Sequence, residues 1–396
     1  MTLLHNPLPR PEGLSEDDLK AFRRDGVVCL RGVLSKAEVN GLRAAVDSQV
    51  EAFGTSETGY DFEDIARQVW SKDAIIDAGS ASRFDMSELR MVLDYDKSVR
   101  PIRDEPASRA AKDDGMFFYD AAGWRRHAGI RDAALDSALP ALVTQLLETE
   151  RLNFWEDTTF VKRPNTPQRT TFHQDYAYFQ IEGSQCCIVW IPLDAADAQN
   201  GTMEYVRGSH RWEEVYAPNV FISQSPHPLS PYERMPDIEG NRDDYDIVSF
   251  DVQPGDVIVH HVMTIHGAGG NGTKDRNRRA VSFRYTGDDI RYCDRPGAIV
   301  QPYLLDRPED GAPLYGRDYP LVWPRPFPGA KIAPVFGELD LLGPLRPDSR
   351  FDAQDAPELP SAERFANPLV QEGRPQEAPW DFQRQSARRQ SLRPTA

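Results

Sequence analysis

Residues 171–176 read Thr-Phe-His-Gln-Asp-Tyr and place His173 and Asp175 two positions apart. We predict a β-strand over 172–179, in which period-two alternation would send both side chains out of the same face. An imidazole and a carboxylate on one face are two of the three protein ligands of the facial triad that holds Fe(II) and leaves coordination positions open. On its own the pattern is weak, because His-x-Asp also occurs by chance as a surface pair. A metal site would need a second histidine from elsewhere in the chain.

Three of the eight histidines lie close together downstream, at His260, His261 and His266. They follow the turn-forming residues Pro-Gly-Asp at 254–256 and lie in an apolar run that we predict to be a strand. Each of them alone is more readily a satisfied structural histidine than a ligand. Together with the His-x-Asp pair, however, this run can supply the second imidazole of a metal site.

Between residues 152 and 287 the chain consists of short apolar runs separated by Gly, Pro and Asn, which is typical of a β-sandwich or barrel. The predicted strands are 155–162, 172–179, 185–193, 202–206, 257–261 and 280–286. Ser15 and Ser35 each begin a capping box, and the predicted helices are 15–25, 35–50 and 139–147, with a short strand at 27–33. Residues 55–135 have no clear period, and we expect helices and loops there that form part of a substrate pocket.

The composition is that of an ordinary globular protein, with 40% hydrophobic and 27% charged residues over 396 positions. A net charge of −16 argues against nucleic acid as the main partner, because binding phosphates would need a basic surface. No apolar run approaches the roughly 18 residues that a membrane span needs, and residues 1–7 lack the features of a signal peptide. The four cysteines have no framework spacing. We therefore expect reduced thiols, a cytoplasmic location and no membrane partner, whereas the oligomeric state is left open.

The chain becomes proline-rich and irregular after Tyr292, and residues 323–328 read Trp-Pro-Arg-Pro-Phe-Pro. These prolines cannot continue a central strand or a helix. We therefore predict one domain over 1–302 and a C-terminal extension over 303–396, whose polar tail from about residue 355 is expected to be weakly ordered.

Several motifs follow one another in an order that resembles the phytanoyl-CoA dioxygenase-like branch of the Fe(II)/2-oxoglutarate oxygenases. The matching stretches are FRRDGVV at 22–28, HQD at 173–175 followed by Tyr178 and Phe179, NGTMEYVRGSH at 200–210, PGD at 254–256 with His266, and Asn271 with RRAV at 278–281. The resemblance implies a double-stranded β-helix, a jelly-roll core of the cupin-like kind with the iron inside one end. The expected fold class is mainly β with flanking helices (α+β), with helices in 15–150, the core over about 152–290 and the irregular extension behind it.

The resemblance also selects the metal ligands. It implies that His173, Asp175 and His266 bind Fe(II), which makes His260 and His261 packing residues or neighbours of the ligands. Related halogenases lack the carboxylate and leave that coordination position to chloride. Because Asp175 is present, hydroxylation is favoured over halogenation.

The co-substrate 2-oxoglutarate would chelate the iron, and its distal carboxylate needs a cation, ideally an arginine. Alternation allows only one of Arg278 and Arg279 to point inward. The series from Arg278 to Arg284 is polar and small, as an active-site face should be, whereas the series that starts at Arg279 is apolar. Both this pattern and the resemblance favour Arg278 as the residue that binds 2-oxoglutarate.

Two further contacts to 2-oxoglutarate are expected. Trp190 falls where the resemblance places an aromatic wall, although it could equally be a core residue. Many relatives have Ser or Thr two residues after the distal histidine, where this chain has Ala268. Thr264 or Thr202 could supply the missing hydroxyl.

The predicted activity is hydroxylation of a C–H bond in a small organic substrate, with 2-oxoglutarate and O₂ converted to succinate and CO₂. Tyr176, Tyr178, Phe179 and Arg284 are predicted to line the substrate pocket, although the three aromatic residues are as readily plain packing. The same iron site could instead serve desaturation, cyclisation or epoxidation. A rival of another class is a non-catalytic β-sandwich with a structural zinc, which would need four protein ligands. The sequence does not identify the substrate.

Overall fold

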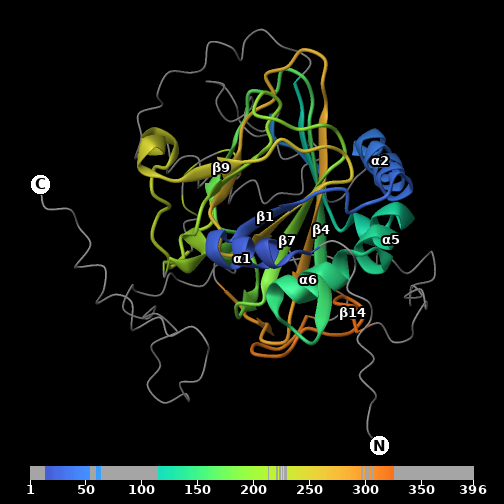
Figure 1. The fold of residues 1–396 in the computed structure, drawn as a ribbon, viewed down its shortest axis with the longest axis vertical. Coiled ribbons are helices and arrows are strands. Elements are labelled where there is room, and N and C mark those ends of the chain that lie inside the picture. The colour runs from blue at the N-terminus through green and yellow to red at the C-terminus, as the bar shows by residue number, and fades with distance from the viewer. Residues whose placement is uncertain are drawn as a thin grey trace, which may run out of the picture.

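The fold is built on two antiparallel sheets that face each other, and Figure 1 shows the strands running side by side in the middle of the molecule. The computed structural model describes residues 14–53, 59–63, 115–212, 214–219, 230–295 and 307–324, and the single positions 222, 224, 226, 298 and 304. The two sheets together form the double-stranded β-helix that the sequence predicted. Their inner faces enclose the site described below.

The larger sheet forms the longer wall of the barrel. Its strands lie in the order β1 (Val27–Leu30), β10 (Val257–His261), β7 (Cys186–Pro192), β12 (Arg278–Thr286), β4 (Leu152–Lys162), β3 (Phe117–Ala121) and β2 (Gly59–Asp61), and β14 (Leu321–Trp323) also pairs with β4. From β1 to β4, neighbours in this order are not consecutive in the chain, as the crossovers of a jelly roll require, whereas β4, β3 and β2 are consecutive strands. The order brings β10, β7 and β12 side by side.

The smaller sheet forms the opposite wall. It consists of β5 (Thr170–His173), β11 (His266–Ala268), β8 (Met203–Val206) and β9 (Ile247–Ser249), in that order. A further two-stranded ladder joins β13 (Arg291–Tyr292) to β6 (Ile181–Glu182). Because β5 and β11 are neighbours, the two histidine-bearing stretches of the sequence meet in one sheet.

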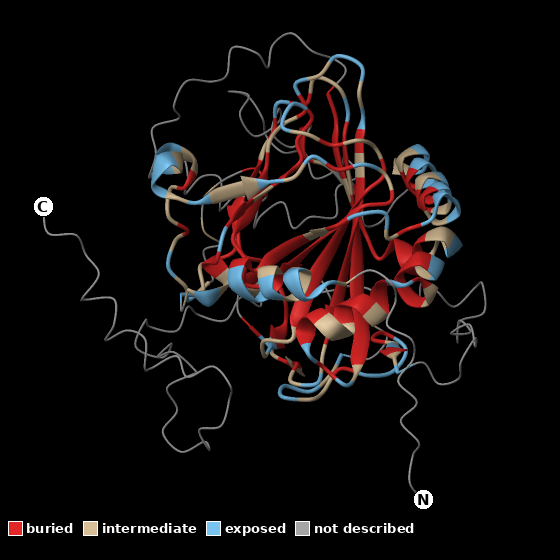
Figure 2. Cartoon of the chain, in the orientation of Figure 1, coloured by how far each residue is buried: buried red, intermediate tan, exposed pale blue. Residues whose placement is uncertain are grey.

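Helices cover the outer face of the larger sheet, as Figures 1 and 2 show. They are α1 (Glu16–Asp25), α2 (Lys36–Glu51), α5 (Ala128–Asp136) and α6 (Leu139–Leu147). The capping boxes predicted at Ser15 and Ser35 are both present. Leu42 and Val46 of α2 pack in one core cluster with Val189 of β7, so the apolar helix faces and the outward-pointing strand residues form the main core.

The strand predicted over 172–179 is wrong in its second half. β5 ends at His173, and the short 3₁₀ helix η4 (Asp175–Tyr178) follows. The Gln174 side chain donates to the carbonyl oxygens of Glu214 and Met263 and accepts from the Tyr216 amide. These contacts bind the chain to neighbouring loops at the point where a strand would otherwise continue.

The stretch 55–135, in which only helices and loops were expected, contains the strands β2 and β3 besides the helix α5, which begins within it. Residues 55–58 and 64–114 of that stretch are outside the described part of the chain.

The described residues beyond 303 pack against the sheet. Asn153 donates to the carbonyl of Tyr319, Phe154 donates to that of Pro320, and Val322 lies in the main core cluster. β14 ends before Pro324, as expected for a residue without an amide hydrogen. The tail predicted from about residue 355 lies outside the described residues.

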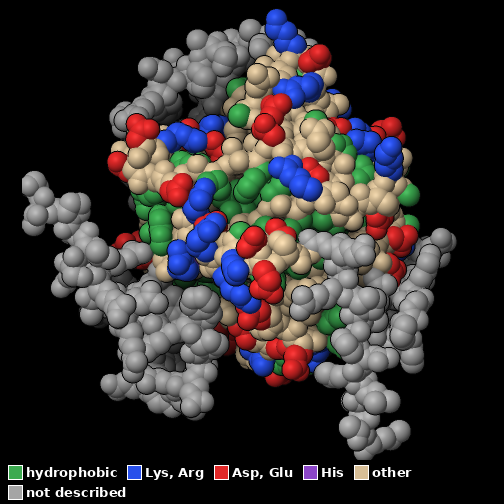
Figure 3. Space-filling view, in the orientation of Figure 1, with side chains coloured by type: hydrophobic (Ala, Val, Ile, Leu, Met, Phe, Trp, Pro, Cys, Tyr) green, Lys and Arg blue, Asp and Glu red, His purple; other side chains and the backbone are tan. Residues whose placement is uncertain are grey.

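On the face drawn in Figure 3, basic and acidic side chains are interspersed, so the negative net charge is not gathered there in one patch. Among the described helices, none combines the length and apolar character that crossing a bilayer requires.

Candidate metal centre and active site

The candidate site is a cavity between the two sheets, with a volume of about 430 Å³ that includes its opening to solvent. Both walls contribute to its lining. The lining residues are Phe160, Thr170, His173, Asp175, Ile188, Trp190, Met203, His260, His266, Arg278, Ser282 and Arg284. All three residues predicted to bind the metal are therefore in one cavity.

The three predicted ligands come from the end of one strand, the start of its neighbour and the turn between sheets. His173 is the last residue of β5, and it pairs directly with His266, the first residue of β11. Asp175 begins η4 and reaches back, so that its Oδ1 lies 3.4 Å from His173 Nε2 and 3.9 Å from His266 Nε2. One ligand atom from each residue lies within 4.8 Å of the others, and no other such group occurs among the described residues.

Backbone carbonyls fix the orientation of both imidazoles. His173 Nδ1 lies 2.7 Å from the carbonyl oxygen of Thr171, and His266 Nδ1 lies 2.9 Å from that of Thr264. A carbonyl oxygen only accepts hydrogen bonds, so each Nδ1 must donate. In the neutral ring the lone pair is then on Nε2, which is the atom that faces Asp175 and is free to bind a metal.

The electrostatics of the cluster suit a cation. Burial alone would raise the pKa of Asp175, but the adjacent His266, His173 and His260 outweigh it and hold that pKa well below its usual value. Burial lowers the pKa of His266 well below its usual value, and the neighbouring histidines lower it further. The charged carboxylate of Asp175 beside the neutral imidazole of His266 suits the binding of a divalent metal.

Buried polar atoms without a hydrogen-bond partner gather in the lining of this cavity. Within the described part of the chain they include Trp190 Nε1, Arg278 Nε, Arg284 Nε and both ring nitrogens of His260. Leaving a buried donor unsatisfied costs about 1–3 kcal/mol. The arginine and tryptophan N–H groups can only donate, so the cavity is suited to a ligand rich in acceptor oxygens.

The two candidate arginines point to opposite sides of β12. Arg278 is 2% exposed and lines the cavity, with its guanidinium carbon 5.9 Å from the centre of the Trp190 ring. Burial lowers the pKa of Arg278 to about 10, which still leaves it charged at neutral pH. Arg279 faces outward and forms ion pairs with Asp194 and Asp47. The inward series that alternation predicted thus includes Arg278 and excludes Arg279.

The hydroxyls expected to replace the one missing at Ala268 are used elsewhere. Thr264 Oγ1 donates to the Gly26 carbonyl at 2.8 Å, and Thr202 Oγ1 donates to that of Phe250. Neither residue is in the cavity lining. The lining instead contains Thr170, which is the Cα partner of Ala268.

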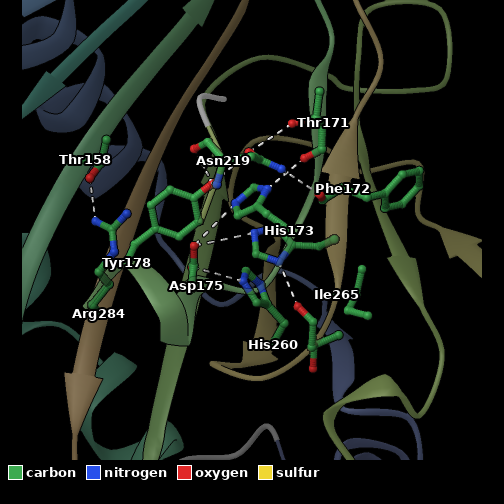
Figure 4. Close-up of polar contacts among 12 residues, drawn as sticks. Thr158, Thr171, Phe172, His173, Asp175, Tyr178, Asn219, His260, Ile265 and Arg284 are labelled. Carbon is green, nitrogen blue, oxygen red and sulfur yellow. Dashed lines mark hydrogen bonds and ion pairs between the residues drawn. The ribbon is translucent and has the colours of Figure 1, made fainter. Parts of the chain in front are cut away.

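The three aromatic residues predicted to line the substrate pocket lie behind its wall rather than in it. The Tyr178 hydroxyl is 2.6 Å from the Asn219 carbonyl, as Figure 4 shows, and its ring edge packs on His173. Phe179 packs on Trp155, and Tyr176 lies beneath the guanidinium of Arg295. Of the four predicted pocket residues, only Arg284 is in the lining.

Sequence reasoning missed Thr170 and treated His260 as either a packing residue or a neighbour of the ligands, without placing it in the cavity lining. A bulge in the β5–β11 pairing lets Thr170 and His173 face the same cavity although they are three residues apart, which simple alternation cannot predict. His260 could have been found from alternation in β10, because Val257 and Val259 pack outward in the main core. Its Nε2 lies 3.7 Å from Asp175 Oδ2, and Figure 4 shows both side chains beside His173.

Comparison with known proteins places the chain in a family. A family model described as phytanoyl-CoA dioxygenase (PhyH) matches residues 22–280. Phytanoyl-CoA dioxygenase domain-containing protein 1 of Danio rerio is 24% identical over 281 residues, which are 68% of this chain and 89% of that protein. A probable phytanoyl-CoA dioxygenase of Caenorhabditis elegans is 27% identical over 141 residues, so that match spans only 34% of this chain and 41% of the worm protein.

Two solved structures share the fold. The non-haem α-ketoglutarate-dependent carbocyclase SnoK from nogalamycin biosynthesis is 24% identical, with a TM-score of 0.53 over 78% of this chain and 96% of that one. The epimerase SnoN, solved with Fe³⁺, α-ketoglutarate and nogalamycin RO, is 21% identical, with a TM-score of 0.52 over 78% of this chain and 98% of that one. At these identities the likeness establishes the architecture alone. The family model matches well over half of this chain, and the chain therefore belongs to the phytanoyl-CoA dioxygenase family.

Proposed function

We propose that the protein is an Fe(II)- and 2-oxoglutarate-dependent oxygenase that hydroxylates a C–H bond of a small organic substrate. The observation that carries the proposal is the convergence of His173, Asp175 and His266 in a cavity lined with unsatisfied donors. Membership of the phytanoyl-CoA dioxygenase family supports the same chemistry. A cytoplasmic location, expected from the sequence, stays a prediction.

The donor set fits ferrous iron. Two neutral imidazoles and one carboxylate are the ligands of the facial triad, which leaves coordination positions open, whereas a structural zinc site is closed by four protein ligands. His260 is buried nearby, but it is not in the group whose ligand atoms converge. Bound iron, with 2-oxoglutarate and O₂, would supply the oxidising chemistry that yields succinate, CO₂ and hydroxylated product.

Arg278 is proposed to bind the distal carboxylate of 2-oxoglutarate. Its guanidinium is buried, charged and without a partner at Nε, and an arginine fork matches a carboxylate with two parallel hydrogen bonds. Trp190 lies beside it and offers a further unsatisfied N–H group. Both side chains would hold the co-substrate in one orientation toward the triad.

Thr170 is proposed to take over the role of the hydroxyl missing at Ala268. It accepts a hydrogen bond from Lys162 Nζ at 3.3 Å, so its own proton is not used in that contact. Lys162 is held by the carbonyl oxygens of Gln168 and Gly269 and pairs in register with Arg278. The threonine hydroxyl is therefore oriented close to the arginine that is proposed to bind 2-oxoglutarate.

The direct test measures succinate formed from 2-oxoglutarate under air, with Fe(II) present or removed by a chelator. The wild type should form succinate slowly without substrate and only when Fe(II) is present. His173→Ala should lose this turnover, whereas Arg279→Gln, on the outer face of the same strand, should retain it. Unchanged turnover in His173→Ala would rule out the assigned iron site.

A further inference from the structure

A second buried arginine lines the cavity and has no role in the proposed binding of iron or 2-oxoglutarate. Arg284 is 5% exposed and lies on the inner face of β12, six residues beyond Arg278. At about 3.3 Å per residue, the two Cα atoms are separated by roughly 20 Å along the strand. The two guanidinium groups also have different neighbours, the Trp190 ring for Arg278 and the Phe179 ring for Arg284, so they lie in different parts of one cavity.

Arg284 belongs to a row of residues that runs across the sheet to the metal site. Ile188 of β7 pairs with His260 of β10 on one side and with Arg284 of β12 on the other. His260 contacts Asp175, as described above. Figure 4 shows Arg284 on the far side of Asp175 from His260. A ligand bound by Arg284 would thus lie beside the iron ligands, and not at the end where Arg278 lies.

The guanidinium of Arg284 is held in place but keeps donors to spare. Nη1 donates to Thr158 Oγ1, and the guanidinium carbon lies 5.1 Å from the centre of the Phe179 ring. Its nearest carboxylate is Glu156, whose Oε2 is 4.0 Å from Nη1 and therefore beyond hydrogen-bonding distance. Nε has no partner among the described residues. Arg284 is positioned and desolvated without a bidentate carboxylate.

When Fe(II) and 2-oxoglutarate are bound, the charges within the cavity leave that of Arg284 without a counter-charge. Ferrous iron and doubly charged 2-oxoglutarate cancel each other. Asp175 balances one of the two lining arginines, and among the described residues no other carboxylate lines the cavity. Glu156 pairs in register with Arg284 and faces the same side of the sheet, but its Oε2 lies 4.0 Å from Nη1, so it offsets the remaining charge without a hydrogen bond.

We propose that Arg284 binds an anionic group of the substrate, a carboxylate or a phosphate, and that the protein oxidises a small organic acid. This inference rests on the proposed function of the same site. The body of the substrate would lie on Ile188 and Phe160, the apolar lining residues of the larger sheet, with its reactive C–H group toward the triad. An amine would be repelled by the Arg284 charge, and a neutral molecule would leave that charge without a counter-ion.

The experiment measures binding under anaerobic conditions, by isothermal titration calorimetry on protein loaded with Fe(II) and 2-oxoglutarate. The probes are hexanoate and phenyl phosphate, each compared with an uncharged counterpart, hexanamide or phenol. Binding of 2-oxoglutarate to the Fe(II)-loaded protein is measured separately. The variants are Arg284→Gln, Arg284→Lys, Arg278→Gln and Glu156→Gln, and the near-ultraviolet circular dichroism of each confirms its fold.

At least one anion should bind the wild type more tightly than its uncharged counterpart does. Arg284→Gln should weaken the binding of that anion by about 30-fold or more, because one member of a buried charged pair is lost. Arg284→Lys should weaken it less, since it keeps the charge but not the fork. Glu156→Gln should strengthen it, because a competing carboxylate is removed. If Arg284 served only to neutralise Glu156, the anion would bind the wild type and Arg284→Gln equally, and binding that depends on Arg284 would appear only in Glu156→Gln.

Binding of 2-oxoglutarate separates failure of this inference from failure of the proposed function. It should depend on Arg278 and change by less than about threefold in Arg284→Gln. If the wild type does not bind 2-oxoglutarate at all, the proposed function fails. If 2-oxoglutarate binds as expected but no anion binding depends on Arg284, the anionic-substrate proposal is overturned. Loss of 2-oxoglutarate binding in Arg284→Gln alone would overturn it as well.

Discussion

At the scale of single residues, the site is defined by which polar atoms are satisfied and which are not. The Nδ1 atoms of His173 and His266 contact carbonyl oxygens, which leaves their Nε2 atoms for a metal. Threonine hydroxyls, too, either have their proton used in a hydrogen bond or keep it for a ligand. Thr264 donates to a carbonyl, whereas the Thr170 hydroxyl accepts from a lysine in the cavity wall. Sequence alone cannot separate these two threonines, because Thr264 contacts Gly26, 238 positions away, and Thr170 faces the cavity only through the bulge in the β5–β11 pairing.

Exchanging each threonine for valine should separate the two roles. Thr170→Val should raise the 2-oxoglutarate concentration needed for half-maximal succinate formation by about tenfold, the equivalent of one hydrogen bond. Thr264→Val should leave that concentration unchanged and lower the free energy of unfolding by about 1 kcal/mol, because only the bond to Gly26 is lost. Succinate formation in the absence of substrate measures the 2-oxoglutarate dependence, and urea denaturation measures the stability. A change in 2-oxoglutarate dependence in Thr264→Val alone would reverse the assignment.

Asp157 is predicted to make stability depend on pH. It is fully buried on the outer side of β4 and accepts from the amides of Gly123 and Trp124. Burial raises the pKa of Asp157 to about 6, although the Trp124 amide opposes the rise. The folded state therefore binds the proton more tightly than the unfolded state, so this contribution is full below about pH 4 and is lost as pH rises through about 6.

The difference in unfolding free energy between the wild type and Asp157→Asn isolates this contribution, since all other titrations cancel. The unfolding free energy of the wild type minus that of Asp157→Asn should fall by about 3 kcal/mol between pH 4 and pH 7, the equivalent of a shift of roughly two pKa units. Urea denaturation across this range measures it. A difference that stays constant with pH would show that Asp157 is not the group responsible.

At the scale of elements, alternation succeeded where strands are regular and failed where they are interrupted. Strand β12 is long and paired on both sides, so the inward series Arg278, Ser282 and Arg284 could be predicted from the sequence. The β5 stretch has a bulge and ends in η4, so the His-x-Asp pair converges through a turn and not through one strand face. The structure brings the three predicted residues together, but through a geometry that the sequence did not predict.

Gly26 links the first helix to the barrel, and its replacement should test that junction. It ends α1 with φ at +75°, and its carbonyl accepts from the His261 amide and the Thr264 hydroxyl. A Cβ there would lie 2.6 Å from Thr264 Oγ1 and closer still to the His210 ring. Gly26→Ala should therefore lower the free energy of unfolding by about 2–4 kcal/mol, from backbone strain and overpacking together.

Gly32→Ala is the matched control for this prediction. Gly32 also has a positive φ, of +61°, but nothing lies within 4 Å of a Cβ built there. Gly32→Ala should therefore lower the free energy of unfolding by only about 1 kcal/mol, the penalty for an alanine in the left-handed backbone region. Thermal unfolding of both variants gives the comparison. Equal losses would mean that the contact with His210 and Thr264 carries no strain.

At the scale of the whole molecule, the boundary of the folded unit depends on contacts that composition does not reveal. The sequence predicted a domain over 1–302 followed by an irregular extension, because proline content rises after Tyr292. Yet Leu314, Tyr319 and Val322 are each at most 3% exposed and pack within the core clusters. A proline-rich segment can contribute buried side chains without forming long strands, and hydrophobic periodicity does not detect it.

Truncation should show how much the barrel depends on this segment. Ending the chain at residue 302 removes three buried hydrophobic side chains, the buried Asp318 that pairs with Arg125, and the pairing of β14 with β4. At roughly 1.5–3 kcal/mol for each buried side chain, the loss is about 5 kcal/mol or more, which is comparable to the whole stability of a typical domain. The 1–302 chain should therefore lack a cooperative thermal transition, whereas a chain ending at residue 324 should keep one. Because β4 carries both Asp157 and the wall behind Arg284, loss of β14 should also abolish Fe(II)-dependent succinate formation. If the 1–302 chain unfolds at the same temperature as the 1–324 chain, the contacts of residues 307–324 do not stabilise the barrel.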